Sequence, residues 1–331
     1  MWDPDLIFDT SKNYFTEHVG ERVLAPTWGG YKDMKEIPLS LSYLQEAKRA
    51  GMKITPLLHN DFDLQETKKL LHDSGAVQNL ARQITATALV YDFDGWNLDF
   101  ENMDEADKFL YTKFIKTVSE KLHMHGKEIS VDITVNSNSP NWSLCYDRKG
   151  MAAYVDYEVI MGYDQTPGGS RYSGPVSSYS WLKHHIAMLL KQVPNNKLVL
   201  GLPFYTRIWT GKEGQAASSV LMMKQIKSLL GQNNIGLFWN PEDRQYVGIW
   251  EENGQTRKVW FEERRSLQEK VSLAHDYKLA GLAFWRYGFE TEDIYDQIEG
   301  AFLNKKDESV RYKNRSEDIL IKFRERLKRA Q

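Results

Sequence analysis

The chain has 331 residues, of which 41% are hydrophobic and 12% aromatic, so it can form one large domain or two ordinary ones and is too apolar for a disordered protein. Its 43 basic residues nearly balance its 45 acidic residues, which argues against a dominant surface for nucleic acid. The single cysteine, Cys145, rules out an internal disulfide.

Membrane and targeting patterns are missing from the sequence. The chain begins Met1-Trp2-Asp3-Pro4-Asp5, which lacks the basic start and apolar stretch of a signal peptide. No apolar run approaches the roughly 18 residues that a membrane helix needs. We therefore expect neither a membrane nor a nucleic acid as partner, and the sequence does not indicate a protein partner.

Short apolar runs of strand character alternate along the chain with segments of helical periodicity. The eight runs are 23–28, 53–59, 93–101, 129–135, 155–163, 198–204, 259–262 and 281–285. This alternation predicts an α/β fold, and eight such units predict a (β/α)8 TIM barrel. A doubly wound sheet is the rival, but the turn after the first run, 27–31, lacks the G-x-G-x-x-G pattern of that fold.

The intervening segments carry helix signals. The first predicted helix passes through Leu41 and ends at Gly51, which suits the left-handed conformation of a C-cap. A long helical stretch is expected from about Leu70 to Ile84, and Asp104 is placed to cap the helix that follows.

Two parts of the chain exceed the length of a simple barrel. Residues 208–257 predict a small α+β insertion between strands six and seven, with a tight turn at Asn253-Gly254, so that the barrel domain would span residues 1–303. The tail, 304–331, has ten basic and five acidic residues and one apolar helical face. We expect a solvated helix on the outside of the barrel, with a partner-binding helix as the alternative.

The most informative segment is 93–101, in which polar and apolar residues alternate. Asn97, Asp99 and Glu101 share one face of the expected strand, and Trp96, Leu98 and Phe100 share the other. Charges about 7 Å apart repel by about 2.5 kcal/mol at an effective dielectric constant near 20, which favours a protonated carboxyl. The pattern therefore predicts Glu101 as a general acid above Asp99 at the mouth of the barrel.

The segment has two alternative interpretations. An edge strand could present the polar face to water, and a cluster of Asp, Asn and Glu could bind a hard cation. The segment has the apolar character of a central strand, and alternating ligands on one strand do not wrap an ion. We therefore expect no metal and no cofactor.

The segment resembles the signature D-G-x-[DN]-x-[DN]-x-E of glycoside hydrolase family 18, the chitinase-like enzymes, which lies on the fourth barrel strand; here it is the third clear run. Three later segments resemble family motifs: 161–164 (M-x-Y-D), 201–207 (G-x-P-x-Y-G-R, with Thr206 in place of Gly) and 281–285 (the last strand). The segments 25–28, 56–60 and 139–143 are most similar to the bacterial spore-germination, cortex-lytic branch.

The resemblance implies a retaining mechanism in which the N-acetyl oxygen of the substrate is the nucleophile. Glu101 would be the acid and base, Asp99 would orient the acetamido group, and Tyr163 would bind its carbonyl. The implied substrate-binding residues are Asn97, Asp164, Met161, Tyr205, Arg207, Trp285 and Trp28. Core packing is the alternative for Tyr163 and Trp285, although their place at strand ends favours the site. Asn97 replaces the commoner Asp and removes one ionisable neighbour.

The resemblance also implies a substrate class. We expect an N-acetylglucosaminidase acting on peptidoglycan, in particular spore cortex, at the spore, the cell wall or outside the cell. A chitinase acting on chitin oligomers is the alternative within this class. A carbohydrate-binding lectin without activity is the alternative of another class, and the presence of Glu101 argues against it because such proteins usually lack the acid.

Overall fold

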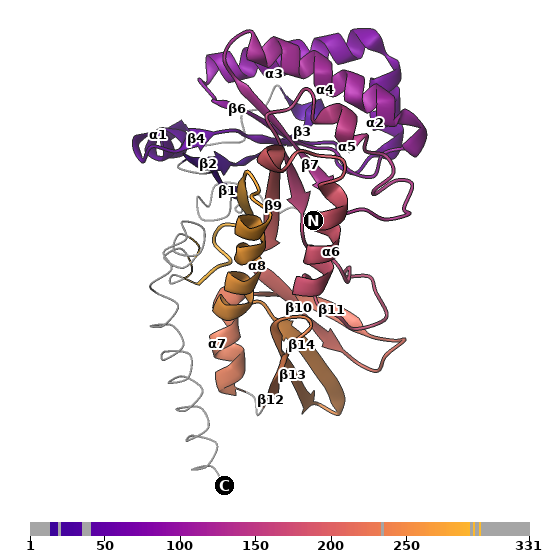
Figure 1. Cartoon of the computed structure of the whole chain (residues 1–331), viewed down its shortest axis with the longest axis vertical. Coiled ribbons are helices and arrows are strands. Elements are labelled where there is room, and N and C mark those ends of the chain that lie inside the picture. The colour runs from indigo at the N-terminus through magenta and orange to yellow at the C-terminus, as the bar shows by residue number, and fades with distance from the viewer. Residues whose placement is uncertain are drawn as a thin grey trace.

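The computed structural model describes residues 14–18, 21–34, 41–232, 235–291, 294 and 298. The strands form one sheet of ten and one of five (Figure 1). In spatial order the larger sheet contains β3 (Thr27–Gly30), β5 (Leu57–His59), β6 (Gly95–Asp99), β7 (Glu128–Thr134), β8 (Tyr157–Met161), β9 (Leu198–Pro203), β15 (Gly281–Trp285), β1 (Tyr14–His18), β2 (Glu21–Ala25) and β4 (Lys53–Ile54).

The larger sheet is mostly parallel and strongly curled. Neighbours from β3 through β15 pair in parallel, and so do β2 and β4. Only Pro26 separates β2 from β3, and only Thr55 and Pro56 separate β4 from β5. The backbone pairing continues across these breaks, because Thr55 N donates to Leu24 O and Leu57 N donates to Pro26 O. The strands β2 and β3 thus form one interrupted strand, and β4 and β5 form a second one that pairs with it in parallel. The two ends of the spatial order, β3 and β4, therefore lie on these two neighbouring strands.

The strand β1 differs from the prediction of eight parallel strands. It lies between β15 and β2 and pairs with both in the antiparallel sense. Among the described residues, the curled, mostly parallel sheet of the predicted barrel is present, with seven parallel positions and one antiparallel strand in place of eight parallel strands.

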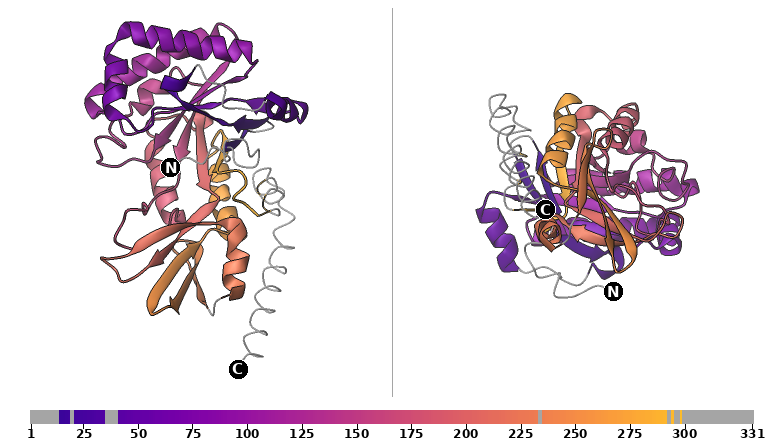
Figure 2. Two further views of the ribbon diagram at one scale, coloured as in Figure 1. Left: turned by 180° about the vertical axis from the view of Figure 1, so that it is seen from behind. Right: turned by 90° about the horizontal axis from the view of Figure 1, so that it is seen from below.

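Helices cover the outside of the curled sheet. They are α1 (Leu41–Arg49), α2 (Leu64–His72), α3 (Ser74–Val90), α4 (Lys108–His123), α5 (Arg148–Met151), α6 (Tyr179–Leu189) and α8 (Arg264–Asp276), whereas α7 (Met223–Gln232) contacts the strand Ala217–Met222 of the smaller sheet. In Figures 1 and 2, α2, α3 and α4 lie together over β6 and β7. Apolar side chains from strands and helices form one large core in this layer.

Local helix signals are confirmed with one correction. Gly51 follows α1 at a φ of 78°, and the Asp104 side chain accepts a bond from Ala106 N. The long stretch expected from Leu70 to Ile84 is instead two helices. Asp73 divides them, because its side chain accepts bonds from Gly75 N and Ala76 N and so starts a new helix.

The smaller sheet is antiparallel and lies in the chain between β9 and β15. Its order is β11 (Ala217–Met222), β10 (Tyr205–Thr210), β14 (Gln255–Phe261), β13 (Gln245–Glu252) and β12 (Gly236–Asn240). An α+β unit is therefore present, and its Asn253-Gly254 turn has positive φ at both residues, as predicted. The run 259–262, however, was predicted as the seventh barrel strand and instead belongs to β14.

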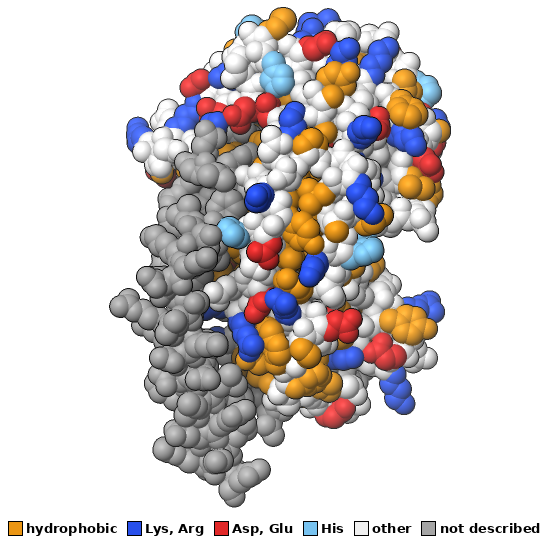
Figure 3. Space-filling model, in the orientation of Figure 1, with side chains coloured by type: hydrophobic (Ala, Val, Ile, Leu, Met, Phe, Trp, Pro, Cys, Tyr) orange, Lys and Arg blue, Asp and Glu red, His pale blue; other side chains and the backbone are white. Residues whose placement is uncertain are grey.

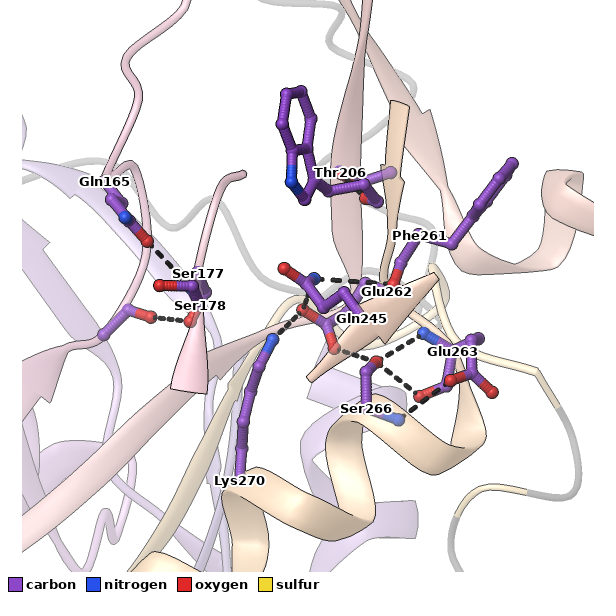
Figure 4. A network of polar contacts seen from close by, with 12 residues as sticks. Gln165, Ser177, Ser178, Thr206, Gln245, Phe261, Glu262, Glu263, Ser266 and Lys270 are labelled. Carbon is purple, nitrogen blue, oxygen red and sulfur yellow. Dashed lines mark hydrogen bonds and ion pairs between the residues drawn. The ribbon is translucent and has the colours of Figure 1, made fainter. Parts of the chain in front are cut away.

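A buried polar network joins the smaller sheet to α8 (Figure 4). Lys270 and Glu262 form an ion pair in which both side chains are fully buried. Gln245 Nε2 donates to the Glu262 carboxylate at 3.2 Å, and Ser266 Oγ donates to its other oxygen. Burial raises the pKa of Glu262 and lowers that of Lys270. Because both charges are fully buried, removal of one partner would leave an uncompensated buried charge, and the ion pair therefore holds the smaller sheet against α8.

A second buried carboxyl lacks such partners and gives a stability prediction. Glu158 in β8 is fully buried, and neither of its carboxyl oxygens has a hydrogen-bond partner among the described residues. Burial raises its pKa from 4.5 to about 8, against the opposing charges of Arg148 and Lys197. The folded state therefore retains a proton that the unfolded chain loses above about pH 4.5. The stability contributed by this proton falls as the pH rises from about 4.5 to about 8.

Replacing Glu158 by Gln is expected to remove this dependence. Thermal melts at pH 5 and pH 8 should show the variant gaining on wild type at the higher pH, by about 3 kcal/mol, because a difference of one bound proton is worth about 1.4 kcal/mol per pH unit. A difference between variant and wild type that stays constant across this pH range would contradict the prediction.

The described surface has mixed charge. On the face drawn in Figure 3, basic and acidic side chains are interspersed, in keeping with the near balance of charge in the sequence. Within the described ranges, no helix combines the length and the apolar character needed to cross a membrane.

Candidate active site

The site is built on β6, whose alternation follows the prediction. Trp96, Leu98 and Phe100 are fully buried in the core against the helices. Trp96 Nε1 donates to Ile84 O of α3, which anchors that face of the strand. The opposite face carries Asn97, Asp99 and, two residues beyond the strand end, Glu101.

The face that carries Asn97 is called the inner face of the curled sheet. Asn97 Nδ2 donates to Ser130 Oγ and to Asp132 Oδ1, both at 3.0 Å and both on β7. Ser130 is in register with Tyr157 of β8, which therefore lies on the same face. Asn97 thus has a structural role inside the sheet, where it fixes the position of the Asp132 carboxyl.

Three carboxyl groups meet at the carboxyl end of β6 and β7. Burial raises the pKa of Asp99 to about 7 and that of Asp132 well above its usual range. Glu101 has its pKa raised to about 9, first by burial and then by Asp99, Asp132 and Asp164. Burial is the largest cause of this raised pKa, and the repulsion by Asp99 that the alternation predicts comes second. Glu101 therefore keeps its proton at neutral pH.

Asp132 belongs to this carboxyl cluster and was not predicted from the sequence. It lies in β7, where Ser130, Asp132 and Thr134 alternate with Ile129, Val131 and Ile133. This is the same period-two signal that identified Asp99 and Glu101, so the sequence contained it. A single carboxyl within an apolar run is less conspicuous than a pair.

A second cluster connects the ends of β8 and β10. Asp164 Oδ1 accepts bonds from the Tyr205 hydroxyl at 3.0 Å and from Arg207 Nη2 at 3.2 Å. The rings of Tyr163 and Tyr205 meet edge to face with their centroids 6.2 Å apart. Glu101 contributes to the raised pKa of Tyr205 after burial and Asp164, which places this cluster beside the carboxyl groups.

Thr206 occupies the position at which the G-x-P-x-Y-G-R motif has Gly. It is buried, and its hydroxyl donates to Trp260 O of β14. The residue that replaces Gly therefore ties β10, which carries Tyr205 and Arg207, to the next strand of the smaller sheet.

Met161 and Trp285 lie at the ends of two further strands. Met161 is the last residue of β8 and is in register with Thr134 of β7 and Gly201 of β9. Trp285 ends β15 opposite Pro203 and packs against a small apolar cluster on the inner face. Both residues therefore lie at the same end of the sheet as Asp99.

Trp28 does not lie with these residues. Its ring packs against Tyr91, Phe93 and Trp96 with centroids 5.6–5.8 Å apart, and it is 4% exposed. It is three residues from Ala25, which faces the inner side, and strand alternation turns it to the helices. The prediction that Trp28 lines the cleft is wrong.

An exposed aromatic pair lies at the rim and was not predicted as part of the site. Phe62 and Trp142, 56% and 42% exposed, have ring centroids 5.9 Å apart. Asn102 Nδ2, next to Glu101 in the chain, donates to Phe62 O at 2.8 Å. The two rings therefore offer exposed apolar surface near the segment that carries Glu101.

Together these features are typical of a site for acid–base chemistry. Buried carboxyl groups, of which Glu101 has its pKa raised to about 9, lie at the carboxyl ends of parallel strands, next to tyrosine hydroxyls and an arginine. The described residues contain no group of three or more His, Cys, Asp or Glu side chains arranged to hold a metal ion.

Comparisons with known proteins identify the family. Residues 40–290 match the profile of glycosyl hydrolases family 18. The chain is 26% identical over 265 residues to the uncharacterized glycosylase YvbX of Bacillus subtilis, covering 77% of this chain and 76% of that protein. It is 26% identical over 246 residues to the cortical fragment-lytic enzyme of the same organism, covering 72% of this chain but only 56% of the relative.

The fold agrees with this assignment. A chitinase from Chromobacterium violaceum superposes with a TM-score of 0.73 at 21% identity, covering 79% of this chain and 83% of that one. The protein belongs to glycoside hydrolase family 18.

Proposed function

We propose that the protein is a retaining N-acetylglucosaminidase that cleaves N-acetylglucosamine linkages in peptidoglycan, with spore cortex fragments as its substrates. The observation that carries the proposal is the Asp99 and Glu101 pair at the carboxyl end of β6. Burial keeps the Glu101 carboxyl protonated at neutral pH, which is the state that a general acid requires.

In the proposed reaction the Glu101 proton passes to the glycosidic oxygen as the bond to C1 breaks. The carbonyl oxygen of the substrate's own N-acetyl group forms the new bond to C1 and gives an oxazolinium ion. The Glu101 carboxylate then takes a proton from water while the water oxygen forms a bond to C1 and the C1–O bond of the oxazolinium ring breaks, which restores the N-acetyl group and gives the sugar with retained configuration.

Asp99 is suited to orient the acetamido group. Its Oδ1 is buried and has no hydrogen-bond partner among the described residues, so an acetamido N–H would satisfy it. The negative form of this carboxyl would stabilise the oxazolinium ion. The Tyr163 hydroxyl would donate to the acetamido carbonyl.

The remaining residues would hold the sugar. Asp164, Tyr205 and Arg207 offer a bonded set of donors and acceptors for hydroxyl groups. Trp285 would stack beneath the ring, with Met161 beside it and Asn97 acting from below through Asp132. Phe62 and Trp142 extend the apolar surface to a neighbouring sugar.

The division of the chain is also part of the proposal. We assign residues 1–303 to the (β/α)8 glycosidase domain of the family, with the smaller sheet as its α+β insertion. The tail, 304–331, lies outside the described residues, as does the apolar face predicted for it.

The choice of peptidoglycan rests on the likeness to the cortical fragment-lytic enzyme. Chitin oligomers are the second candidate, supported by the likeness to a chitinase in fold. A lectin without activity is opposed by the presence of both carboxyl groups.

The substrate class is tested by incubating the protein with cortex muropeptides and with chitin oligomers of matched length. We expect a higher kcat/KM on the muropeptides and competitive inhibition of both reactions by a thiazoline mimic of the oxazolinium ion. Preferential cleavage of chitin oligomers would replace peptidoglycan by chitin. Binding without cleavage of either substrate would favour the lectin.

A further inference from the structure

Glu101 lies beyond the regular pairing of its strand. The backbone pairing between β5 and β6 ends where His59 faces Asp99, and Glu101 is two residues further on. A segment past the end of a strand has no ladder to fix its position. The general acid of the proposed reaction nevertheless needs a fixed position, because proton transfer depends on placement of the donor.

The side chain of Asn60 replaces the missing ladder. Its Oδ1 accepts a bond from Glu101 N at 3.0 Å, and its Nδ2 donates to Glu101 O at 2.7 Å. The same Nδ2 donates its second hydrogen to Thr67 Oγ1 of α2 at 2.9 Å. The three bonds determine the orientation of the amide, because a flipped group would bring N–H against N–H.

Asn60 is 1% exposed, so water cannot substitute for these bonds. On the other side of the segment, the buried Tyr146 hydroxyl donates to Phe100 O at 2.9 Å. Tyr146 holds the preceding residue, whereas Asn60 holds both backbone groups of Glu101 itself.

We propose that Asn60 is the positioning residue of Glu101: it holds the backbone from which the acid projects and so places the carboxyl against the glycosidic oxygen. The inference rests on the proposed function, because it assigns a role within that reaction. A misplacement of about 1 Å in such a group costs about 100-fold in rate. Substrate binding depends on other residues and should change little.

The test compares two leaving groups with the Asn60→Ala variant. An N-acetylglucosaminide with a sugar leaving group needs protonation by Glu101, whereas a 2,4-dinitrophenyl glycoside departs without it. We expect kcat/KM to fall about 10- to 100-fold for the sugar leaving group and by less than about threefold for the dinitrophenyl substrate. The inhibition constant of a thiazoline should stay within about threefold of wild type. General damage to the fold would lower both rates together and would weaken inhibitor binding.

The Asn60→Asp variant provides a rescue. A protonated carboxyl accepts from one backbone group and donates to the other, as the amide does, and an ionised one cannot donate. The ratio of the variant's kcat/KM to that of wild type should therefore rise as the pH falls toward 5. This arm remains decisive even if Asn60→Ala does not fold, since a ratio that does not vary with pH would overturn the proposal.

The control is Asn195→Ala, which removes a similar bond, from Asn195 Nδ2 to Lys278 O, at the opposite end of the strands. It should match wild type on both substrates. Equal losses on the two leaving groups, or none, in Asn60→Ala would overturn the inference while leaving the proposed function standing. Failure of the proposed function would appear instead as a wild-type protein that cleaves neither substrate.

Discussion

Replacement of Glu101 by Gln is expected to lower kcat on an N-acetylglucosaminide by about 10²- to 10⁴-fold, the usual contribution of a general acid–base group. Glutamine keeps the size of the side chain and can hydrogen-bond, but it cannot deliver a proton to the glycosidic oxygen. KM should stay within a few fold of wild type because the sugar contacts are unchanged.

The pH dependence of wild type should report the same carboxyl. Burial and the neighbouring Asp99 raise the pKa of Glu101 to about 9, so the acid stays protonated at pH 7 and kcat/KM falls as the pH rises through that value. Glu105→Gln, the same change four residues away in the short 3-10 helix Glu105–Asp107, is the matched control and should behave as wild type. Full activity in Glu101→Gln would remove this residue from its proposed role.

The second large effect is expected for Asp99→Asn. The variant loses the negative charge that would stabilise the oxazolinium ion, and removal of one such preorganised group typically costs about 10²- to 10³-fold in kcat. Affinity for a thiazoline mimic should fall as well, because the cationic form of this inhibitor resembles the ion.

Asp99→Asn should also move the alkaline limb of the pH profile. The Asp99 charge is the second cause of the raised pKa of Glu101, after burial. Without it the pKa of Glu101 falls, so kcat/KM should decline at a lower pH than in wild type. A large loss of rate with an unmoved alkaline limb would show that Asp99 does not act on the acid electrostatically.

The alternation of strands and helices that gives a curled, mostly parallel sheet, and the face of β6, could be predicted because both depend on local periodicity. Strict alternation over 96–101 leaves one assignment of faces, and burial of Trp96, Leu98 and Phe100 follows from it. The same reasoning, applied to 129–135, would have found Asp132.

Features that depend on distant pairing could not be predicted in this way. The run 259–262 has the apolar character of a barrel strand, but its partners in β10 and β13 place it in the smaller sheet. The position of Trp28 in the chain predicted a residue that lines the cleft. Its actual place depends on the register shift between Thr27 and Gly29 and on its contacts with Phe93 and Trp96, which only the folded structure shows. The clamp of Asn60 on Glu101 joins residues 41 positions apart, and nothing in the local sequence indicates it.

The most direct test of the proposed mechanism is the anomeric configuration of the first product. Proton NMR during hydrolysis of a β-linked N-acetylglucosamine oligomer distinguishes the two anomers before they equilibrate. Attack by the substrate's own acetamido group predicts that the β-anomer appears first, since two displacements at C1 retain configuration. Initial formation of the α-anomer would mean direct attack by water and would contradict the roles assigned to Asp99 and Tyr163.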